Sequence, residues 1–350
     1  MPSIVEIMRT AKEAGASDVH ITVGIPPKMR VNGSLATMNY SRMMPADTLE
    51  ILLEIMTETQ RERFEDQGEY DMSFSIPELG RYRVNAYKQR GSAALALRLI
   101  GTQVPSPEVL GVPESVMNLY ERKKGLVLVT GPAGSGKSTT LAAIVDKINN
   151  NRDVHVITLE DPIEYLHQHR RAMVNQREIG LDSQSYASAL RAALREDPDV
   201  ILIGEMRDPE TIGAAVTAAE TGRLVLSALH TTGAADTVDR IIDVFPPHLR
   251  QQIRIRFANV LEAVVSQQLI PAMDGRGRAA AFEVMHVNHE VRSLIREGRL
   301  RQLTSVMQTN HETGMITMDE SIAQLFYEGK IDREMAIRSA QDPDGMRNKI

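Results

Sequence analysis

Four short, mainly apolar runs follow one another in the second part of the chain, and longer segments with helical periodicity separate them. The runs predict strands at residues 126–130, 154–159, 200–203 and 224–229. The helical segments between them span residues 137–149, 183–195 and 209–221. Strands that are buried on both faces lack alternation of polar and apolar residues, and helices usually connect parallel strands. The pattern therefore predicts an α/β core with a parallel sheet.

The first 100 residues have a different pattern, in which strand signals outnumber helical ones. Ile4, Met8 and Ala11 share one face of a first helix, and residues 45–67 predict a second helix. Strands are expected at residues 19–23, 28–31, 34–38, 70–76, 81–88 and 93–100. Asn32-Gly33, between the second and third of these, is a strong hairpin signal. These signals predict a small α+β domain.

Residues 101–113 contain three prolines and two glycines, which interrupt helices and strands alike. We therefore expect an N-terminal domain at residues 1–100, a linker at 101–113 and a second domain at 114–350. Within the second domain, residues 266–270 and 279–285 predict an antiparallel pair around the turn Gly275-Arg276-Gly277. Residues 290–340 predict helices only.

Composition narrows the classes of protein without identifying one. The formal net charge of the 350 residues is −6, whereas nucleic-acid binders usually have a basic surplus. The chain has no cysteine, which excludes disulfides and cysteine-based zinc sites. No apolar run approaches the roughly 18 residues of a membrane span, and residues 1–14 do not have the pattern of a signal peptide. We therefore expect a cytoplasmic protein that reaches a membrane only through a partner.

The segment after the run at 126–130 carries the most specific motif of the chain. It matches the phosphate-binding pattern G-x-x-x-x-G-K-[ST] and consists of Gly131, Pro132, Ala133, Gly134, Ser135, Gly136, Lys137, Ser138 and Thr139. A glycine loop between a strand and a helix directs backbone N–H groups at one point, which favours phosphate. We expect Lys137 to reach the β- and γ-phosphates of ATP and the Ser138 hydroxyl to bind Mg²⁺.

Residues with suitable chemistry also follow the other three runs. Glu160 could orient or deprotonate the attacking water, although an acidic turn would have the same sequence. Glu205 is the first acid after an apolar strand, as in a Walker B motif without its usual aspartate, and we assign it to Mg²⁺. His230 is expected to contact the γ-phosphate, and a purely structural histidine is the alternative. Spacing alone thus predicts a nucleotide hydrolase with an accessory domain.

These segments resemble the phosphate loop, Asp box, atypical Walker B motif and His box of the type II/IV secretion ATPase superfamily. The nearest resemblance is to the PilT family, the type IV pilus retraction motors. Residues 16–20, 81–87 and 290–297 resemble that family's N-terminal signature, arginine-bearing strand and AIRNLIRE box. Two departures are visible: Arg223 stands where the His box usually has its first histidine, and Glu290, Val291 and Ser293 replace Ala, Ile and Asn.

The resemblance implies a homohexamer whose subunits have a PAS-like N-terminal domain and a RecA-like P-loop NTPase core. ATP hydrolysis would remove pilin from the base of the fibre through an inner-membrane platform protein. The resemblance also implies that Arg81, Arg83 and Arg98 of the N-terminal domain help to close the ATP site. The core itself has no obvious arginine to neutralise charge on the γ-phosphate, which strengthens this expectation.

Three alternatives remain open. A pilus extension or type II secretion ATPase would typically have an additional N-terminal domain and a four-cysteine zinc site. A nucleic-acid translocase could use the same kind of core, but the acidic net charge disfavours it. An ATP-binding scaffold without turnover would have no need for Lys137, Ser138, Glu160 and Glu205 together.

Overall fold

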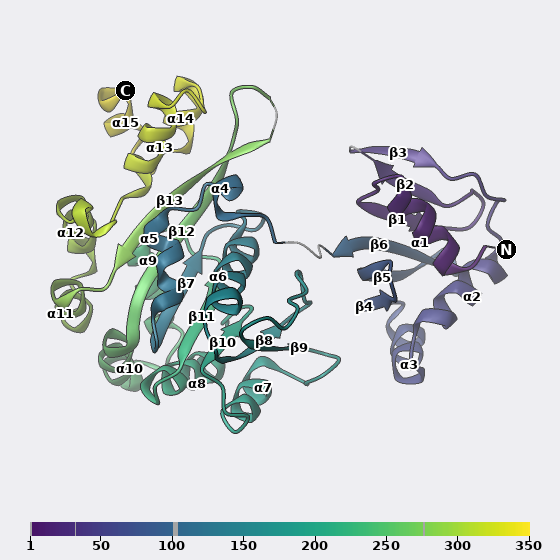
Figure 1. The fold of residues 1–350 in the computed structure, drawn as a ribbon, viewed down its shortest axis with the longest axis horizontal. Coiled ribbons are helices and arrows are strands. Elements are labelled where there is room, and N and C mark those ends of the chain that lie inside the picture. The colour runs from purple at the N-terminus through teal and green to yellow at the C-terminus, as the bar shows by residue number, and fades with distance from the viewer. Residues whose placement is uncertain (1, 32, 101–103, 276) are drawn as a thin grey trace. The chain divides into compact units, whose positions relative to one another are not determined.

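The structure, a computed structural model, describes residues 2–31, 33–100, 104–275 and 277–350. These residues form two compact units (Figure 1). The first unit contains the described residues up to Ile100 together with Glu164–Leu166, and the second contains Val104–Ile163 and His167–Ile350. Each unit has a hydrophobic core of its own. None of the described helices is both long and apolar enough to span a membrane.

The first unit is a six-stranded antiparallel sheet with three helices. The sequence predicts the six strands but only two helices. The strand order is β3-β2-β1-β6-β5-β4. The strands are β1 Asp18–Ile21, β2 Lys28–Val31, β3 Ser34–Thr37, β4 Glu69–Ile76, β5 Gly80–Gln89 and β6 Ser92–Ile100. The helices are α1 Ile4–Glu13, α2 Pro45–Ile55 and α3 Glu58–Gln67. The predicted hairpin joins β2 to β3, although Asn32 of its turn lies outside the described residues.

The single helix predicted for residues 45–67 is wrong, because the chain breaks after Ile55 and starts α3 at Glu58. Thr57 has an extended backbone and caps α3. Its hydroxyl accepts the Gln60 N–H at 3.4 Å, while the Gln60 side-chain oxygen accepts the Thr57 N–H at 2.9 Å. This reciprocal pair is a capping box, so the sequence Thr57-Glu58-Thr59-Gln60 did contain the signal for the break.

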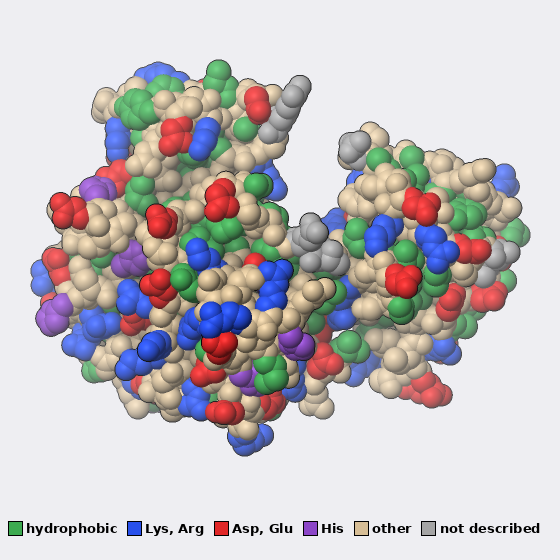
Figure 2. Space-filling view, viewed as in Figure 1, with side chains coloured by type: hydrophobic (Ala, Val, Ile, Leu, Met, Phe, Trp, Pro, Cys, Tyr) green, Lys and Arg blue, Asp and Glu red, His purple; other side chains and the backbone are tan. Residues whose placement is uncertain are grey.

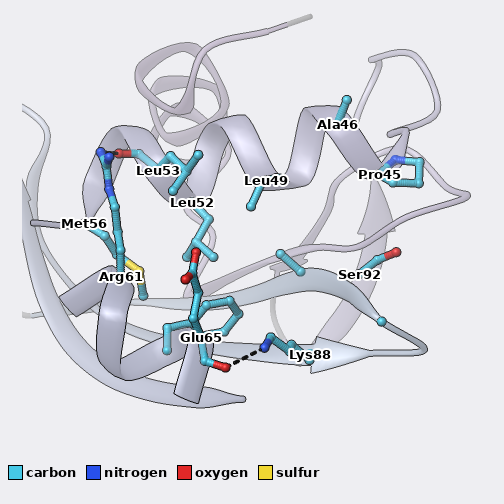
Figure 3. A pocket seen from close by; sticks show the side chains of 13 residues that line it. Pro45, Ala46, Leu49, Leu52, Leu53, Met56, Arg61, Glu65, Lys88 and Ser92 are labelled. Carbon is cyan, nitrogen blue, oxygen red and sulfur yellow. Dashed lines mark hydrogen bonds between the residues drawn. The ribbon is translucent and has the colours of Figure 1, made fainter. Parts of the chain in front are cut away.

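Because α2 and α3 meet at an angle rather than in line, an open pocket of about 360 Å³ lies between them and the β5–β6 hairpin (Figure 3). Leu49, Leu52 and Phe64 contribute apolar surface to it. Lys88 from β5 stands beside Phe64, with its Nζ 5.5 Å from the ring centroid and 2.9 Å from the Glu65 carbonyl oxygen that accepts its hydrogen bond. The cation thus fixes the hairpin to α3.

The second unit contains a seven-stranded sheet with the order β13-β12-β7-β11-β10-β8-β9. All strands from β12 to β9 are parallel, and β13 pairs antiparallel with β12. The strands are β7 Gly125–Thr130, β8 His155–Glu160, β9 Met173–Glu178, β10 Val200–Ile203, β11 Leu224–Leu229, β12 Leu261–Pro271 and β13 Arg278–His286. The predicted parallel sheet and its antiparallel addition are confirmed, although Arg276 of the predicted turn lies outside the described residues.

Helices cover both faces of this sheet. The helices up to α10 are α4 Pro107–Leu110, α5 Glu114–Met117, α6 Lys137–Asn151, α7 Tyr186–Ala193, α8 Pro209–Glu220, α9 Ala234–Asp243 and α10 Pro247–Val260, with a 3-10 turn at Asn118–Glu121. Val127 and Val129 pack with α5 and α6 on one face, whereas Leu126 and Leu128 pack with α7 to α10 on the other. Burial on both faces explains why the strand has no polar alternation.

Part of the predicted linker at residues 101–113 is helical. Residues 101–103 lie outside the described residues, but Pro107 begins the short helix α4. Proline is tolerated at the first helical position because its missing N–H would have no helical partner there. Val104 and Leu110 pack against the core of the second unit. The predicted domain boundaries as such stay a prediction.

The C-terminal segment is mainly helical, as predicted for residues 290–340. It also contains a β-bridge at Ile316 and a further helix, α15, beyond residue 340. Its helices are α11 His289–Glu297, α12 Leu303–Thr309, α13 Met318–Tyr327, α14 Arg333–Ser339 and α15 Pro343–Lys349, with 3-10 turns at Leu300–Gln302 and His311–Thr313. Ile316 forms an antiparallel bridge with Val284 of β13. The helices α13, α14 and α15, yellow in Figure 1, form a separate apolar cluster with residues of β12 and β13.

Removing the cap of α3 should weaken the first unit. Thr57→Ala deletes the hydroxyl that accepts the Gln60 N–H, and the loss of such a cap costs about 1 kcal/mol. We expect urea unfolding of the full chain, followed by circular dichroism, to report this loss. Thr59→Ala is the matched control, since Thr59 is exposed in the same first turn. An equal loss in both variants would contradict the assignment of the cap.

Candidate nucleotide site

The four candidate segments meet at one edge of the parallel sheet. The strands β7, β11, β10 and β8 are consecutive neighbours, and the register aligns their carboxyl ends. The phosphate loop follows β7, His230 follows β11, Glu205 follows β10 after one residue, and Glu160 is the last residue of β8. Ligands of open α/β sheets bind at this edge. The prediction that these residues lie at neighbouring strand ends is confirmed.

Two glycines of the phosphate loop, Gly131 and Gly136, are required by the close approach of β12. Gly131 has a φ of +141°, and a Cβ there would lie 2.2 Å from the Gln267 carbonyl oxygen. Gly136 has a φ of +90°, and a Cβ there would lie 2.8 Å from Nε2 of the same glutamine. The Thr140 hydroxyl donates to the Gln267 side-chain oxygen at 2.7 Å. Gln267 thus supports both ends of the loop, and its position on a distant strand hid it from sequence analysis.

The loop offers mainly hydrogen-bond donors. Lys137 begins α6 and is buried, and its Nζ donates to the carbonyl oxygens of Gly131 at 2.9 Å and Pro132 at 2.8 Å. The Ser135 hydroxyl is buried and has no hydrogen-bond partner among the described residues. No side chain caps the N-terminus of α6. An ammonium, a buried hydroxyl and helix N–H groups suit an anion such as phosphate.

Glu205 is the centre of a charged cluster. Its Oε2 lies 2.7 Å from Nη2 of Arg207 and 3.5 Å from Nε2 of His230. The three side chains line a cavity of about 360 Å³, together with residues of α9 that include Arg240. Arg207 is therefore an arginine of the core that lies beside Glu205 and that the sequence analysis did not identify. A further arginine, Arg278 of β13, donates to the Gly134 carbonyl oxygen at 3.3 Å.

Glu160 is oriented by two side chains of the sheet. Its Oε1 accepts a hydrogen bond from the Thr158 hydroxyl at 2.6 Å and one from Nε2 of Gln176 at 3.2 Å. Thr158 and Gln176 are opposite each other in the register of β8 and β9. Gln176 could not be recognised from the sequence, because the polar strand β9 lacks the apolar run that marks the other strands of this sheet. Glu160 therefore has a fixed orientation rather than that of a solvated turn residue.

Tyr186 is a further residue of the site that sequence analysis missed. Burial raises the pKa of its hydroxyl, and the charges of Asp161, Glu205 and Glu160 raise it further. A Cβ on Gly204 would lie 2.8 Å from the Tyr186 hydroxyl oxygen, which places that oxygen beside the end of β10. A phenol with a raised pKa stays protonated, so it can donate a hydrogen bond among these carboxylates.

The arginines of the first unit lie on one face of its sheet. Arg98 is opposite Arg83 in the β5–β6 register, and Arg81 is two residues from Arg83. Each has a partner: Arg81 donates to the Ser73 hydroxyl at 2.5 Å, Arg83 lies 4.0 Å from Asp71, and Arg98 lies 2.8 Å from Asp18. Arg81, Arg83 and Arg98 therefore lie on one face of this sheet.

The pairing of Arg98 with Asp18 affects the pKa of the Asp18 carboxyl group. Partial burial pushes the pKa of Asp18 up, but hydrogen bonds from Arg98 and Ser17 outweigh this effect and lower the pKa below its ordinary value. The direct interaction itself is the 2.8 Å hydrogen bond from Nε of Arg98 to Oδ1 of Asp18. The arginine face is therefore an ordered arrangement of charges.

The departure from the His box lies away from the phosphate loop. Arg223 directly precedes β11 and its guanidinium donates to the Thr221 carbonyl oxygen at 3.0 Å. His230 follows the opposite end of the same strand. Because the phosphate loop is also at that opposite end, Arg223 does not alter the cluster around Glu205.

The oxygen donors of the site fit Mg²⁺. The Ser138 hydroxyl lies in the first turn of α6, and the Glu205 carboxylate follows β10. Mg²⁺ is usually held by one or two carboxylates together with phosphate and water oxygens. A hydroxyl and a carboxylate beside a phosphate loop match this chemistry.

Comparison with known proteins agrees with this geometry. The family described as type II/IV secretion system protein matches residues 1–276. The chain is 45% identical to a twitching motility protein of Neisseria gonorrhoeae, over 98% of this chain and 92% of that relative. It is 44% identical to the type IV pilus retraction ATPase PilT of Pseudomonas aeruginosa, over 97% of this chain and 99% of that relative.

A solved structure matches over both units. The crystal structure of the pilus retraction motor PilT with bound ADP has a TM-score of 0.93 and 45% identity, and the match covers 99% of this chain and 100% of that one. The predicted fold class, a RecA-like P-loop NTPase core preceded by a PAS-like α+β domain, is thereby confirmed. The chain belongs to the type II/IV secretion system protein family, and within it to the PilT family of pilus retraction ATPases.

Proposed function

We propose that this chain is a motor ATPase that hydrolyses MgATP to power the retraction of a type IV pilus. The observation that carries the proposal is the meeting of the phosphate loop with Glu205, His230 and Glu160 at one edge of the parallel sheet. The relatives named above support the pilus process, because the alignment covers nearly the full length of each.

The phosphate loop and Glu205 bind the nucleotide in this proposal. Lys137 and the backbone N–H groups of the loop hold the β- and γ-phosphates. Ser138 and Glu205 hold Mg²⁺, which when bound supplies positive charge beside the phosphates. The contact of Glu205 with Arg207 keeps the carboxylate at the site.

Glu160 and His230 act on the γ-phosphate in this proposal. Glu160 is oriented by Thr158 and Gln176 and takes the proton of the attacking water. His230 contacts the γ-phosphate and reports its presence to Glu205, from which it is 3.5 Å away. Arg81, Arg83 and Arg98 neutralise the charge that develops as the phosphate leaves.

The proposed assembly is a homohexamer in the cytoplasm that contacts an inner-membrane platform protein and acts on the pilin fibre indirectly. The proposed domains are residues 1–100, a linker at 101–113 and an ATPase domain at 114–350. The support is the family, whose named members include a pilus retraction motor.

A pilus extension or type II secretion ATPase is the alternative within the family, and a nucleic-acid translocase is the alternative from another class. Full-length similarity to proteins named for retraction and twitching disfavours the first. The face of the molecule drawn in Figure 2 mixes acidic and basic side chains rather than presenting one basic stripe, which disfavours the second. Hydrolysis that rises on addition of single-stranded DNA or RNA would favour the translocase.

Lys137→Ala should abolish steady-state phosphate release, because the site loses the cation that holds the β- and γ-phosphates. In a strain without its own copy of the gene, the variant should also fail to restore pilus retraction. Lys147→Ala, on the same helix but away from the loop, is the matched control and should leave both unchanged. Near wild-type turnover by Lys137→Ala would contradict the proposal that the chain is a motor ATPase.

Substitution of Glu160 and of Glu205 should have different kinetic effects. Glu160→Gln is expected to bind MgATP normally and turn it over slowly, because only a transition-state role is lost. Glu205→Gln is expected to raise the Mg²⁺ concentration needed for half-maximal activity. Titration of Mg²⁺ against phosphate release measures both effects. Normal turnover by Glu160→Gln would mean that another group activates the water.

Mixing two inactive variants tests whether the arginines act between subunits. Lys137→Ala subunits retain their arginines, and Arg83→Ala subunits retain their nucleotide site. If one subunit supplies its neighbour, mixed rings should recover part of the phosphate release; if each arginine serves only its own chain, mixing should restore nothing. Arg83→Lys should rescue poorly, since lysine lacks the planar fork that grips phosphate oxygens.

A further inference from the structure

One carboxylate outside the proposed mechanism is buried in the core of the second unit. Glu283 of β13 is 3% exposed, and burial raises its pKa. Its Oε1 accepts the Ala234 N–H at 2.7 Å, and its Oε2 accepts the Met318 N–H at 3.3 Å. Ala234 is the first residue of α9 and Met318 is the first residue of α13. A single side chain therefore binds the N-termini of two helices that are far apart in sequence.

The contact with α9 replaces a missing cap. Gly233 precedes the helix and has no side chain that could bind the first N–H groups. Gly233 has a φ of +98°, a backbone conformation that residues with a side chain rarely adopt, which favours glycine directly before the helix. Because the exposed N–H groups and the helix dipole favour negative charge, the carboxylate suits this place better than a neutral group.

The same helix start is bound to the entrance of the phosphate loop. The Gly233 N–H donates to the Ser266 hydroxyl at 3.1 Å, and that hydroxyl is 2.7 Å from the hydroxyl of Thr130. Thr130 is the last residue of β7 and directly precedes the loop. Thr130, Ser266 and Glu283 are all buried, so water does not compete for these bonds.

The contact with α13 brings the C-terminal helices into the same network. Val284, next to Glu283, pairs with Ile316, and the Phe282 N–H donates to the Ser321 hydroxyl at 2.9 Å. The segment that leads into α13 and the first turn of α13 are thus bound to β13 by the neighbours of Glu283 on either side. A displacement of α13 would pull on Glu283 and, through Ala234, on the segment that carries His230.

We infer that Glu283 is a positioning residue that couples the C-terminal helices to the His230 segment and the phosphate loop. It touches no reacting group, and it acts by fixing the start of α9, four residues after His230. The inference rests on the proposed ATPase function for its kinetic consequence, but the coupling itself is a property of the fold.

Glu283→Gln tests the coupling with little change of shape. The amide can accept only one of the two N–H groups and directs its own NH₂ at the other. We expect kcat for MgATP hydrolysis to fall by up to roughly 10²-fold, as small displacements of catalytic groups do, with KM little changed. Glu320→Ala is the matched control: it removes the capping box of α13 but leaves the bond to α9, and should lower the melting temperature without lowering kcat.

Backbone hydrogen exchange gives a readout independent of turnover. Glu283→Gln should speed exchange in the first turns of α9 and α13 together, whereas Glu320→Ala should affect α13 alone. Wild-type kcat in Glu283→Gln, or faster exchange in α13 only, would overturn the inference. A wild-type protein without ATPase activity would refute the proposed function and leave the exchange test valid.

If Glu283→Gln fails to fold, Ser266→Ala is the second variant, because it breaks the hydrogen bonds that join the start of α9 to Thr130. Wild-type kcat in that variant would overturn the inference equally.

Discussion

The register of four parallel strands is the constraint on which the candidate site depends. Thr130 is opposite Leu229, Ser227 is opposite Ile203, and Ile203 is opposite Leu159. A slip of one residue would exchange the side chains that pack against α6 with those that pack against α7 and α8. Because both layers are closely packed, such an exchange would not fit. The same packing that excludes the slip keeps the phosphate loop beside Glu205 and His230.

The sequence predicted the features that depend on residues close together along the chain. The apolar runs marked the buried strands, the glycines marked the phosphate loop, and Glu160, Glu205 and His230 stood at strand ends where their chemistry was recognisable. The failures had local causes too. The polar strand β9 carries no apolar run, since it is the edge of its sheet. The capping box at Thr57 was present but was outweighed by the helical periodicity on either side of it.

The residues that support the site could not be found in this way, because their role depends on pairing over long sequence distances. Gln267 reaches the phosphate loop only because β12 lies next to β7. Tyr186 begins α7 and meets the carboxylates only after that helix packs on the sheet. Arg207 is only two residues after Glu205 in the sequence. No sequence signal, however, distinguishes a loop arginine that contacts the site from one that contacts only water.

The arginine face of the first unit has a cost that depends on its exposure. An arginine that binds a phosphate must first leave its carboxylate partner. Arg83 and Asp71 are 52% and 59% exposed at 4.0 Å, whereas Arg98 is 73% exposed but its partner Asp18 is only 14% exposed. Exposed pairs contribute about 1 kcal/mol or less, because water screens them. Exchange of Asp71 for the more highly charged phosphate is therefore easy for Arg83, whereas Arg98 would leave a largely buried carboxylate behind, which makes its exchange more costly.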